Sequence, residues 1–77
     1  MNDDKLIPLV ADVLKLPPEQ VTEALAMGQV ESWDSLKHME LVVAIETAYG
    51  LELSFDEIVA MKSVGDIRQV LATHGKA

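Results

Sequence analysis

Apolar side chains recur at helical spacing along most of this sequence, and that spacing constrains the fold more than any other feature. The first stripe falls at positions i, i+3, i+4, i+7 and i+8 and comprises Leu6, Leu9, Val10, Val13 and Leu14. This pattern is typical of an amphipathic helix with one buried face. Pro8 lacks a backbone N–H and fits only a first turn, so we expect the regular helix to begin near Leu6. No segment alternates apolar and polar residues over the length of a strand, which favours an all-α fold.

Prolines and capping residues mark the expected ends of the first two helices. Pro17-Pro18 ends the first helix, and residues 19–28 then form a long connection with one turn around residues 21–25. Asp34 is a good N-cap for a second helix over residues 35–49. Gly50 supplies the left-handed residue that commonly follows a helix.

Two further helices follow the second one. Residues 54–57, Ser-Phe-Asp-Glu, form a capping box that opens a short third helix, and residues 63–66 open a fourth in a similar way. The apolar stripe of the last helix comprises Val64, Ile67, Val70 and Leu71. We therefore predict a small four-helix bundle, with three longer helices, one short third helix and a long loop between the first two. A chain of 77 residues supports one hydrophobic core, so we expect one domain over residues 1–77.

The chain is strongly acidic. It has 13 Asp and Glu against six Lys and Arg, a net charge of −7, and residues 31–57 hold seven of the acids with one lysine. Nucleic acids and anionic membranes attract Lys and Arg, so this charge argues against both and favours basic protein partners. The absence of cysteine excludes disulfides, thiolate metal sites and a cysteine nucleophile, and it favours the cytosol. The acidic start does not resemble a signal peptide.

The second helix has two apolar faces. At about 100° per residue, one face carries Leu41, Val42, Ile45, Ala48 and Tyr49, enough to pack against the other helices. The opposite face carries Leu36, Met39 and Val43, interleaved with Glu40, Glu46 and Thr47. This second face is either core beneath the long loop or an exposed partner surface with an apolar centre and acidic edges. The acidic side chains favour exposure, because glutamate is rarely buried unpaired.

Residues 33–36, Trp-Asp-Ser-Leu, place a serine directly after the expected N-cap. Its hydroxyl lies beside unpaired backbone N–H groups at the positive end of the helix dipole, a favourable place for a phosphate. A helix-start serine is also ordinary there, so position alone leaves both interpretations open. Asp34-Ser35-Leu36, followed by Glu-Leu-Val-Val-Ala-Ile-Glu at 40–46 and Gly-Leu-Glu-Leu at 50–53, resembles the acyl carrier proteins. Size, acidity and helix spacing extend the resemblance over nearly the whole chain.

The resemblance implies a carrier function. Ser35 would be esterified by 4′-phosphopantetheine, which a phosphopantetheinyl transferase takes from coenzyme A. The chain would be a substrate of that enzyme and not an enzyme itself. The thiol of the arm would carry acyl groups as thioesters and present them to successive acyl-charging and acyl-accepting enzymes with basic docking patches. Asp34 would cap the helix and help to hold metal-bound coenzyme A in the transferase complex.

The resemblance also implies a partner-binding face, which agrees with the second apolar face of the helix. Its residues would be Leu36, Met39, Glu40, Val43 and Glu46, with Asp56 and Glu57 extending it onto the third helix. We expect a monomer. The alternative from the residues alone is an unmodified helical adaptor that docks basic partners through the same acidic face.

Three departures from the housekeeping fatty-acid carriers concern the pathway. Trp33 replaces a small residue, Lys37 stands where those carriers have an acid, and Thr47-Ala48 replaces part of an acidic pair. These changes suggest a stand-alone carrier for a dedicated pathway, such as polyketide, modified amino acid or surface-polymer assembly. The peptidyl carriers, which have glycines before the serine, fit less well.

The two histidines have ordinary interpretations. His38 falls on the core side of the second helix near its end, either as a partly buried histidine with a backbone or side-chain partner or at the mouth through which an acyl chain would enter the bundle. A hydrolase triad of Asp34, Ser35 and His38 fails on geometry, because one helical turn cannot place a base between the serine and the acid. His74 is expected at a helix end, where the dipole favours it. No spacing of carboxylates with histidine predicts a metal site.

Overall fold

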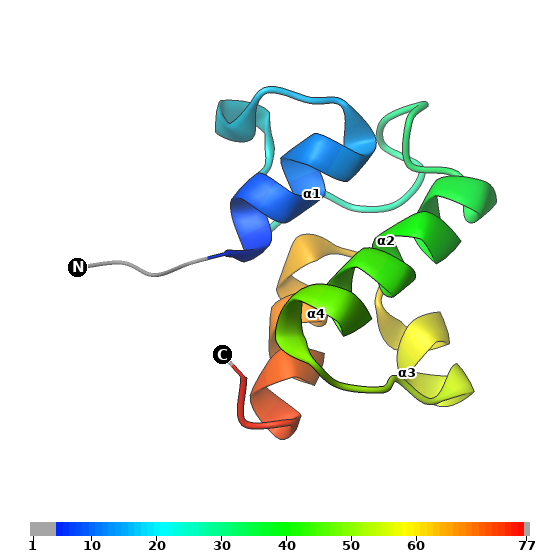
Figure 1. Cartoon of the computed structure of the whole chain (residues 1–77). Coiled ribbons are helices and arrows are strands. Elements are labelled where there is room, and N and C mark those ends of the chain that lie inside the picture. The colour runs from blue at the N-terminus through cyan, green and yellow to red at the C-terminus, as the bar shows by residue number, and fades with distance from the viewer. Residues whose placement is uncertain (1–4, 77) are drawn as a thin grey trace.

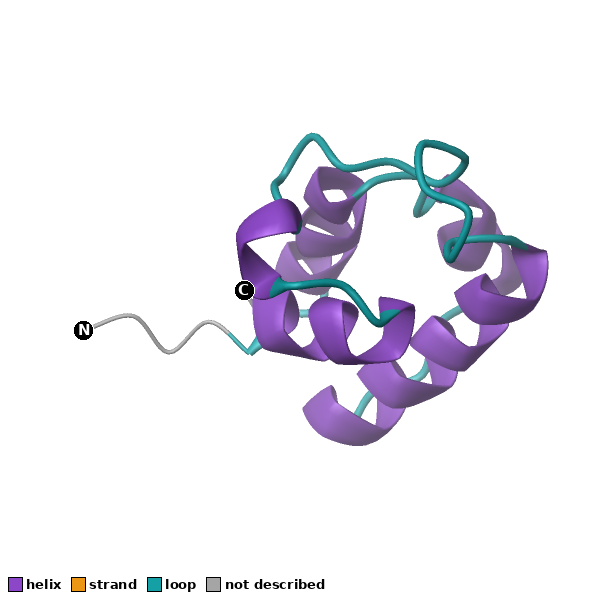
Figure 2. Ribbon diagram, turned by 90° about the horizontal axis from the view of Figure 1, so that it is seen from above, coloured by secondary structure: helices purple, strands orange, loops and turns teal. Residues whose placement is uncertain are grey.

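The computed structural model describes residues 5–76. The elements in chain order are α1 (Leu6–Leu14), a short 3₁₀ turn η1 (Pro18–Gln20), α2 (Ser35–Tyr49), α3 (Phe55–Ala60) and α4 (Val64–Thr73). In Figure 1, α2 runs diagonally through the molecule with α1 above it and α3 and α4 below it. Seen from above, the helices surround a common interior (Figure 2). The predicted all-α fold, with one short helix and a long loop between α1 and α2, is confirmed.

Local hydrogen bonds explain where the helices begin and end. The Asp34 carboxylate accepts from the Lys37 N–H at 2.9 Å, which caps the start of α2, and Gly50 ends α2 in the left-handed region. Helix α1 ends earlier than the prolines predict, because Lys15 adopts φ 60° and the Leu16 N–H turns back to the Ala11 carbonyl. The connection then forms a 3₁₀ turn at Pro18–Gln20 and, within the predicted range of residues 21–25, a second turn in which the Leu25 N–H donates to the Thr22 carbonyl at 3.0 Å.

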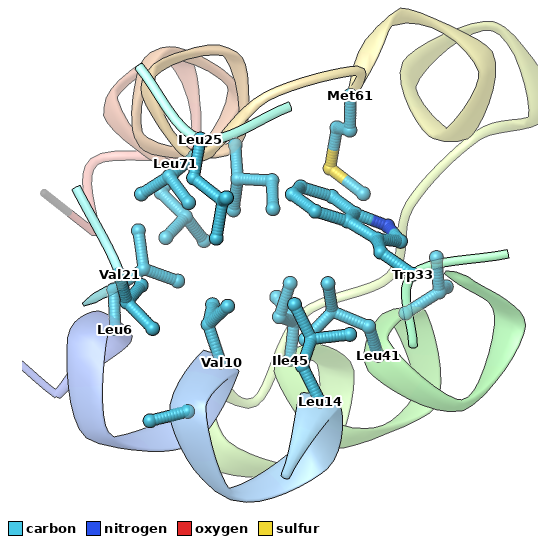
Figure 3. Close-up of a cluster of buried hydrophobic side chains, with 14 of the residues drawn as sticks. Leu6, Val10, Leu14, Val21, Leu25, Trp33, Leu41, Ile45, Met61 and Leu71 are labelled. Carbon is cyan, nitrogen blue, oxygen red and sulfur yellow. The ribbon is translucent and has the colours of Figure 1, made fainter. Parts of the chain in front are cut away.

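The core is one hydrophobic cluster to which every longer helix contributes (Figure 3). Its buried members are Leu6, Val10, Ala11, Leu14, Val21, Leu25, Trp33, Leu41, Val42, Ile45, Leu53, Met61, Val64, Ile67 and Leu71. Leu9, Val13, Val70 and Tyr49 of the predicted stripes pack at the edge of this cluster and are partly buried. The prediction for Ala48 is wrong: this residue is exposed, because no neighbouring segment covers its position near the end of α2.

The long loop between α1 and α2 is fixed to the start of α4. The Val64 N–H donates to the Leu25 carbonyl at 2.9 Å, and the Met27 N–H donates to the Lys62 carbonyl at 2.8 Å. The Gly65 N–H donates to the Glu23 carbonyl, and a Cβ at Gly65 would lie only 3.2 Å from that oxygen. The loop therefore closes the α4 side of the bundle and leaves the second apolar face of α2 uncovered. Within residues 5–76 no helix has the length and apolar character to cross a membrane.

Candidate functional site: the start of helix α2

Ser35 is the first residue of α2 and is exposed to solvent. Asp34 directly before it is extended, and its carboxylate is occupied by the Lys37 N–H. The Asp34 carbonyl accepts from the His38 N–H at 2.8 Å, so the first turn is fixed by two bonds to one residue. Ser35 therefore sits at the positive end of a 15-residue helix with its hydroxyl open to an incoming group.

Trp33 and His38 anchor this first turn from the inside. The Trp33 side chain is 1% exposed, and its Nε1–H donates to His38 Nδ1 at 3.1 Å. His38 Nε2 lies 3.0 Å from the Ile58 carbonyl oxygen of α3. The indole nitrogen is only a donor and the carbonyl only an acceptor, so these two partners together fit the tautomer in which Nδ1 accepts and Nε2–H donates. The prediction that His38 has hydrogen-bond partners is confirmed, and at 8% exposure the residue is buried rather than partly buried as expected.

The second apolar face of α2 is exposed, which excludes the alternative that it is core beneath the loop. Leu36 is 71% exposed, Met39 49% and Val43 59%. With Glu40 and Ala44 they line an open groove of about 460 Å³. Glu40 forms an exposed ion pair with Lys37 at 3.2 Å, so the departure at Lys37 neutralises part of this acidic edge.

The three other acids predicted for partner binding differ in their surroundings. Glu46 is partly buried, and its carboxylate accepts from the Leu53 N–H at 2.9 Å, so it fixes the loop after α2. Glu57 accepts from the Ser54 N–H and lies 2.8 Å from His74 Nε2. The Ser54 N–H, and then His74, hold the pKa of Glu57 below its ordinary value. Asp56 is exposed, as expected for a docking residue.

Helix α3 adds two exposed apolar side chains that the sequence reasoning missed. Phe55 is 77% exposed and Val59 is 52% exposed. They are four residues apart and therefore share one face of α3. The signal was present in the sequence, since the capping box already places Phe55 in the first turn of a helix too short to bury both of its faces.

The comparisons with known proteins agree with this geometry. Residues 4–71 match the family model described as a phosphopantetheine attachment site. The chain is 33% identical over 64 residues to an acyl carrier protein of Thermosynechococcus vestitus, covering 83% of this chain and 79% of that one. It is 28% identical over 71 residues to an acyl carrier protein of Clostridium perfringens, covering 92% and 93%. A non-reducing polyketide synthase of Penicillium rubens is 34% identical over 68 residues, which cover 88% of this chain but 2% of that enzyme.

Fold, site and family model together define a phosphopantetheine-binding helical domain. The chain belongs to the acyl carrier protein family. It is accordingly a carrier and not an enzyme, its cofactor is 4′-phosphopantetheine, and it interacts with a phosphopantetheinyl transferase and with biosynthetic enzymes. The start of α2 fits that group, because an exposed hydroxyl stands beside the backbone N–H groups that favour a phosphate.

Proposed function

We propose that Ser35 is the residue that carries the phosphopantetheine arm. The observation that supports this most is the state of the four serines in the chain. The hydroxyls of Ser54 and Ser63 accept from the backbone as helix caps, and the Ser32 hydroxyl is buried. Ser35 alone combines an exposed side chain with the first position of a long helix and with the Asp-Ser-Leu pattern of the family.

The attachment uses the Ser35 hydroxyl as a nucleophile within the transferase complex. Its oxygen forms a bond to the phosphorus that bears the pantetheine, and the bond from that phosphorus to the nucleotide phosphate of coenzyme A breaks. The hydroxyl proton passes to a base of the transferase, since His38, three residues away, has both ring nitrogens engaged in the interior. Asp34 holds the first turn in place through its bond from the Lys37 N–H, and in the transferase complex it would help to hold the metal-bound coenzyme A. The attached arm ends in a thiol that carries acyl groups as thioesters.

We propose that partner enzymes dock on the exposed face of α2. Leu36, Met39 and Val43 form its apolar centre, and Glu40 and the Asp56 carboxylate on α3 supply negative charge. A basic patch on the partner complements this charge and raises the rate of encounter, while the apolar centre sets how long the complex lasts. Glu46 and Glu57 belong to this acidic region by charge, although their carboxylates are held by Leu53 and His74.

We propose a dedicated biosynthetic pathway, such as polyketide, modified amino acid or surface-polymer assembly, in the cytosol. The support comes from the site itself. Trp33, two residues before the proposed attachment residue, fills the interior, and the Lys37–Glu40 ion pair reduces the negative charge of the docking face. The polyketide synthase segment that resembles this chain is consistent with that class of pathway. The absence of cysteine is consistent with the cytosol.

The decisive experiment is intact-mass measurement after incubation with coenzyme A and a permissive transferase. We expect a gain of one phosphopantetheine in the natural sequence and in Ser63→Ala, and no gain in Ser35→Ala. Ser63→Ala is a matched control because it removes a helix-cap hydroxyl from α4 without touching α2. No gain under conditions that modify a reference carrier would refute the attachment and favour the unmodified adaptor.

A further inference from the structure

Helices α2 and α3 meet where His38 contacts Ile58, and this contact region, here called the seam, lies next to the proposed attachment residue Ser35. Ser35 and His38 are one helical turn apart on α2, so their Cβ atoms are about 5–6 Å apart. His38 also contacts α3 through the Ile58 carbonyl. A chain tethered to Ser35 that turns toward the interior of the bundle therefore meets the imidazole of His38 first.

The seam is closed by a relay of hydrogen bonds. The indole of Trp33 donates to the imidazole, and the imidazole donates to the last turn of α3. The two rings are nearly parallel, with an interplanar angle of 23° and centroids 6.2 Å apart. The imidazole is 8% exposed, so it occupies the gap between the helices and does not lie on top of it. To open the seam, a guest chain must break both bonds and leave the indole N–H without an acceptor.

The interior behind this seam is already filled. The Trp33 indole points into the core cluster toward Met61, with Leu41 nearby (Figure 3). These three side chains are each at most 1% exposed. Protein interiors pack as densely as organic crystals, so an added alkyl chain would have to displace side chains that belong to the core.

A pocket lies on the solvent side of the same seam. It has a volume of about 360 Å³ and is lined by Met27, His38, Ile58, Val59, Met61 and Lys62. Two of its lining residues also meet Trp33: His38 accepts from the indole N–H, and the indole points toward Met61 (Figure 3). The imidazole of His38 is therefore one wall of this pocket.

On the basis of the proposed attachment to Ser35, we propose that the Trp33–His38 pair excludes the carried acyl chain from the core. The chain stays outside the bundle, where a long saturated hydrocarbon gains nothing from burial in its carrier. The cargo class that suits such a carrier is short or polar acyl groups, presented directly to the partner enzyme. Trp33 and His38 are in this sense specificity-determining residues.

Fluorescence of Trp33, the sole tryptophan in the chain, tests the exclusion directly. The protein is loaded from octanoyl-coenzyme A or from 8-bromooctanoyl-coenzyme A, and bromine quenches an indole that it touches. We expect equal Trp33 emission from the two forms, because an outside chain cannot reach a side chain that is 1% exposed. Quenching that is specific to the bromo form would show that the chain enters the core and would overturn the proposal.

Variants of the two histidines test the part played by the imidazole. His38→Ala opens the seam and should give bromine quenching, whereas His38→Gln keeps a donor and an acceptor and should remain unquenched. His74→Ala is the matched control, since that histidine pairs with Glu57 at the far end of α4. If His38→Ala folds and its Trp33 emission is not quenched, the Trp33–His38 pair does not exclude the chain. If His38→Ala does not fold, the quenching measurement on the natural sequence still tests the proposal.

Melting temperatures of acetyl and octanoyl forms supply a second readout through Trp33 itself. Trp33→Ala leaves an apolar cavity on the order of 150 Å³, the size that binds small hydrocarbons. Its octanoyl form should melt above its acetyl form, because a chain bound only by the folded state stabilises it. In the natural sequence, and likewise in Trp33→Phe, the octanoyl form should melt at the same temperature as the acetyl form. A higher melting temperature for the octanoyl form of the natural sequence would overturn the proposal.

The attachment of the arm to Ser35 and the exclusion of the acyl chain from the core are tested by different measurements, so either one can be refuted without the other. Intact mass reports whether Ser35 is loaded, and Trp33 emission reports where the chain lies. Free 8-bromooctanoate added to the unloaded protein tests the seam without the arm. We expect it to quench His38→Ala and not the natural sequence, whether or not Ser35 carries the arm.

Discussion

Replacing Trp33 by phenylalanine isolates the hydrogen bond between the indole and His38. Phenylalanine keeps most of the buried ring but removes the Nε1–H that donates to His38 Nδ1 at 3.1 Å. The imidazole cannot compensate by moving its proton to Nδ1, because Nε2 would then face the Ile58 carbonyl without a proton, at 3.0 Å. The variant therefore leaves one buried acceptor without a partner.

Two contributions set the size of the effect. A buried polar group left unsatisfied costs about 1–3 kcal/mol. The ring atoms lost from a residue that is 1% exposed cost about 1 kcal/mol more. We therefore expect Trp33→Phe to lower the free energy of unfolding by about 2–4 kcal/mol, a large part of the about 5–15 kcal/mol typical of a whole domain.

The assay is urea unfolding followed by circular dichroism, on Trp33→Phe, His38→Leu and the double variant. His38→Leu leaves the indole N–H without an acceptor, whereas the Ile58 carbonyl still accepts from the Met61 N–H at 3.3 Å. The double variant leaves neither group unsatisfied. Its destabilisation should fall short of the sum of the single variants by the two costs together, about 2–6 kcal/mol.

Additivity within experimental error would refute this reasoning, because it would mean that the indole and the imidazole do not depend on each other. A single-variant loss below about 0.5 kcal/mol for Trp33→Phe would refute it as well, since that is the size of an ordinary surface substitution.

Three further predictions concern the docking face and the acid stability. Glu40→Lys should slow phosphopantetheine transfer and weaken the salt dependence of the transfer rate. It should leave thermal unfolding nearly unchanged, because the Glu40 side chain is 51% exposed. An unaltered transfer rate at both low and high salt would mean that Glu40 takes no part in docking. Met39→Ala should weaken partner binding by about 1–2 kcal/mol with little loss of stability, whereas Ile45→Ala should lower the free energy of unfolding by about 2–5 kcal/mol. Equal destabilisation by the two, measured by urea unfolding, would mean that Met39 is packed in the core. Because the pKa of Glu57 lies below the ordinary value of 4.5, its stabilising effect is present above that pH and is lost as the pH falls through the lowered pKa. Glu57→Gln should therefore flatten the acid side of a melting-temperature profile, and His74→Ala should flatten it in part; parallel profiles would contradict the pairing.

The sequence predicts most of the fold because its signals are local. The Asp34 cap and Gly50 determine the ends of α2, and the Ser54 capping box determines the start of α3. Burial is harder to predict where it depends on neighbouring elements. Ala48 lies on the apolar side of α2 but is exposed, because the helical spacing does not report which segment covers the last turn.

The candidate site also has features that the sequence predicts and features that it does not. The position of Ser35 after a cap, and the exposed face that begins at Leu36, follow from spacing along one helix. The contact of His38 with Ile58 joins residues 20 apart in the chain, and the contact of His74 with Glu57 joins residues 17 apart. No periodicity encodes such pairings, because they depend on how α3 and α4 pack against the rest of the bundle.

Helix α3 has six residues and none of them is fully buried. A helix of this length is not stable by itself in water, so its folding depends on its cap and on a few side-chain contacts such as those of His38 and His74. It is therefore expected to be the cooperative unit that opens at the lowest free energy while α1, α2 and α4 stay folded. In native-state deuterium exchange its amides should lose protection first, ahead of those in the middle of α2. A segment that unfolds locally at low cost can adjust its shape to successive enzymes without disturbing the core that holds Ser35 in place.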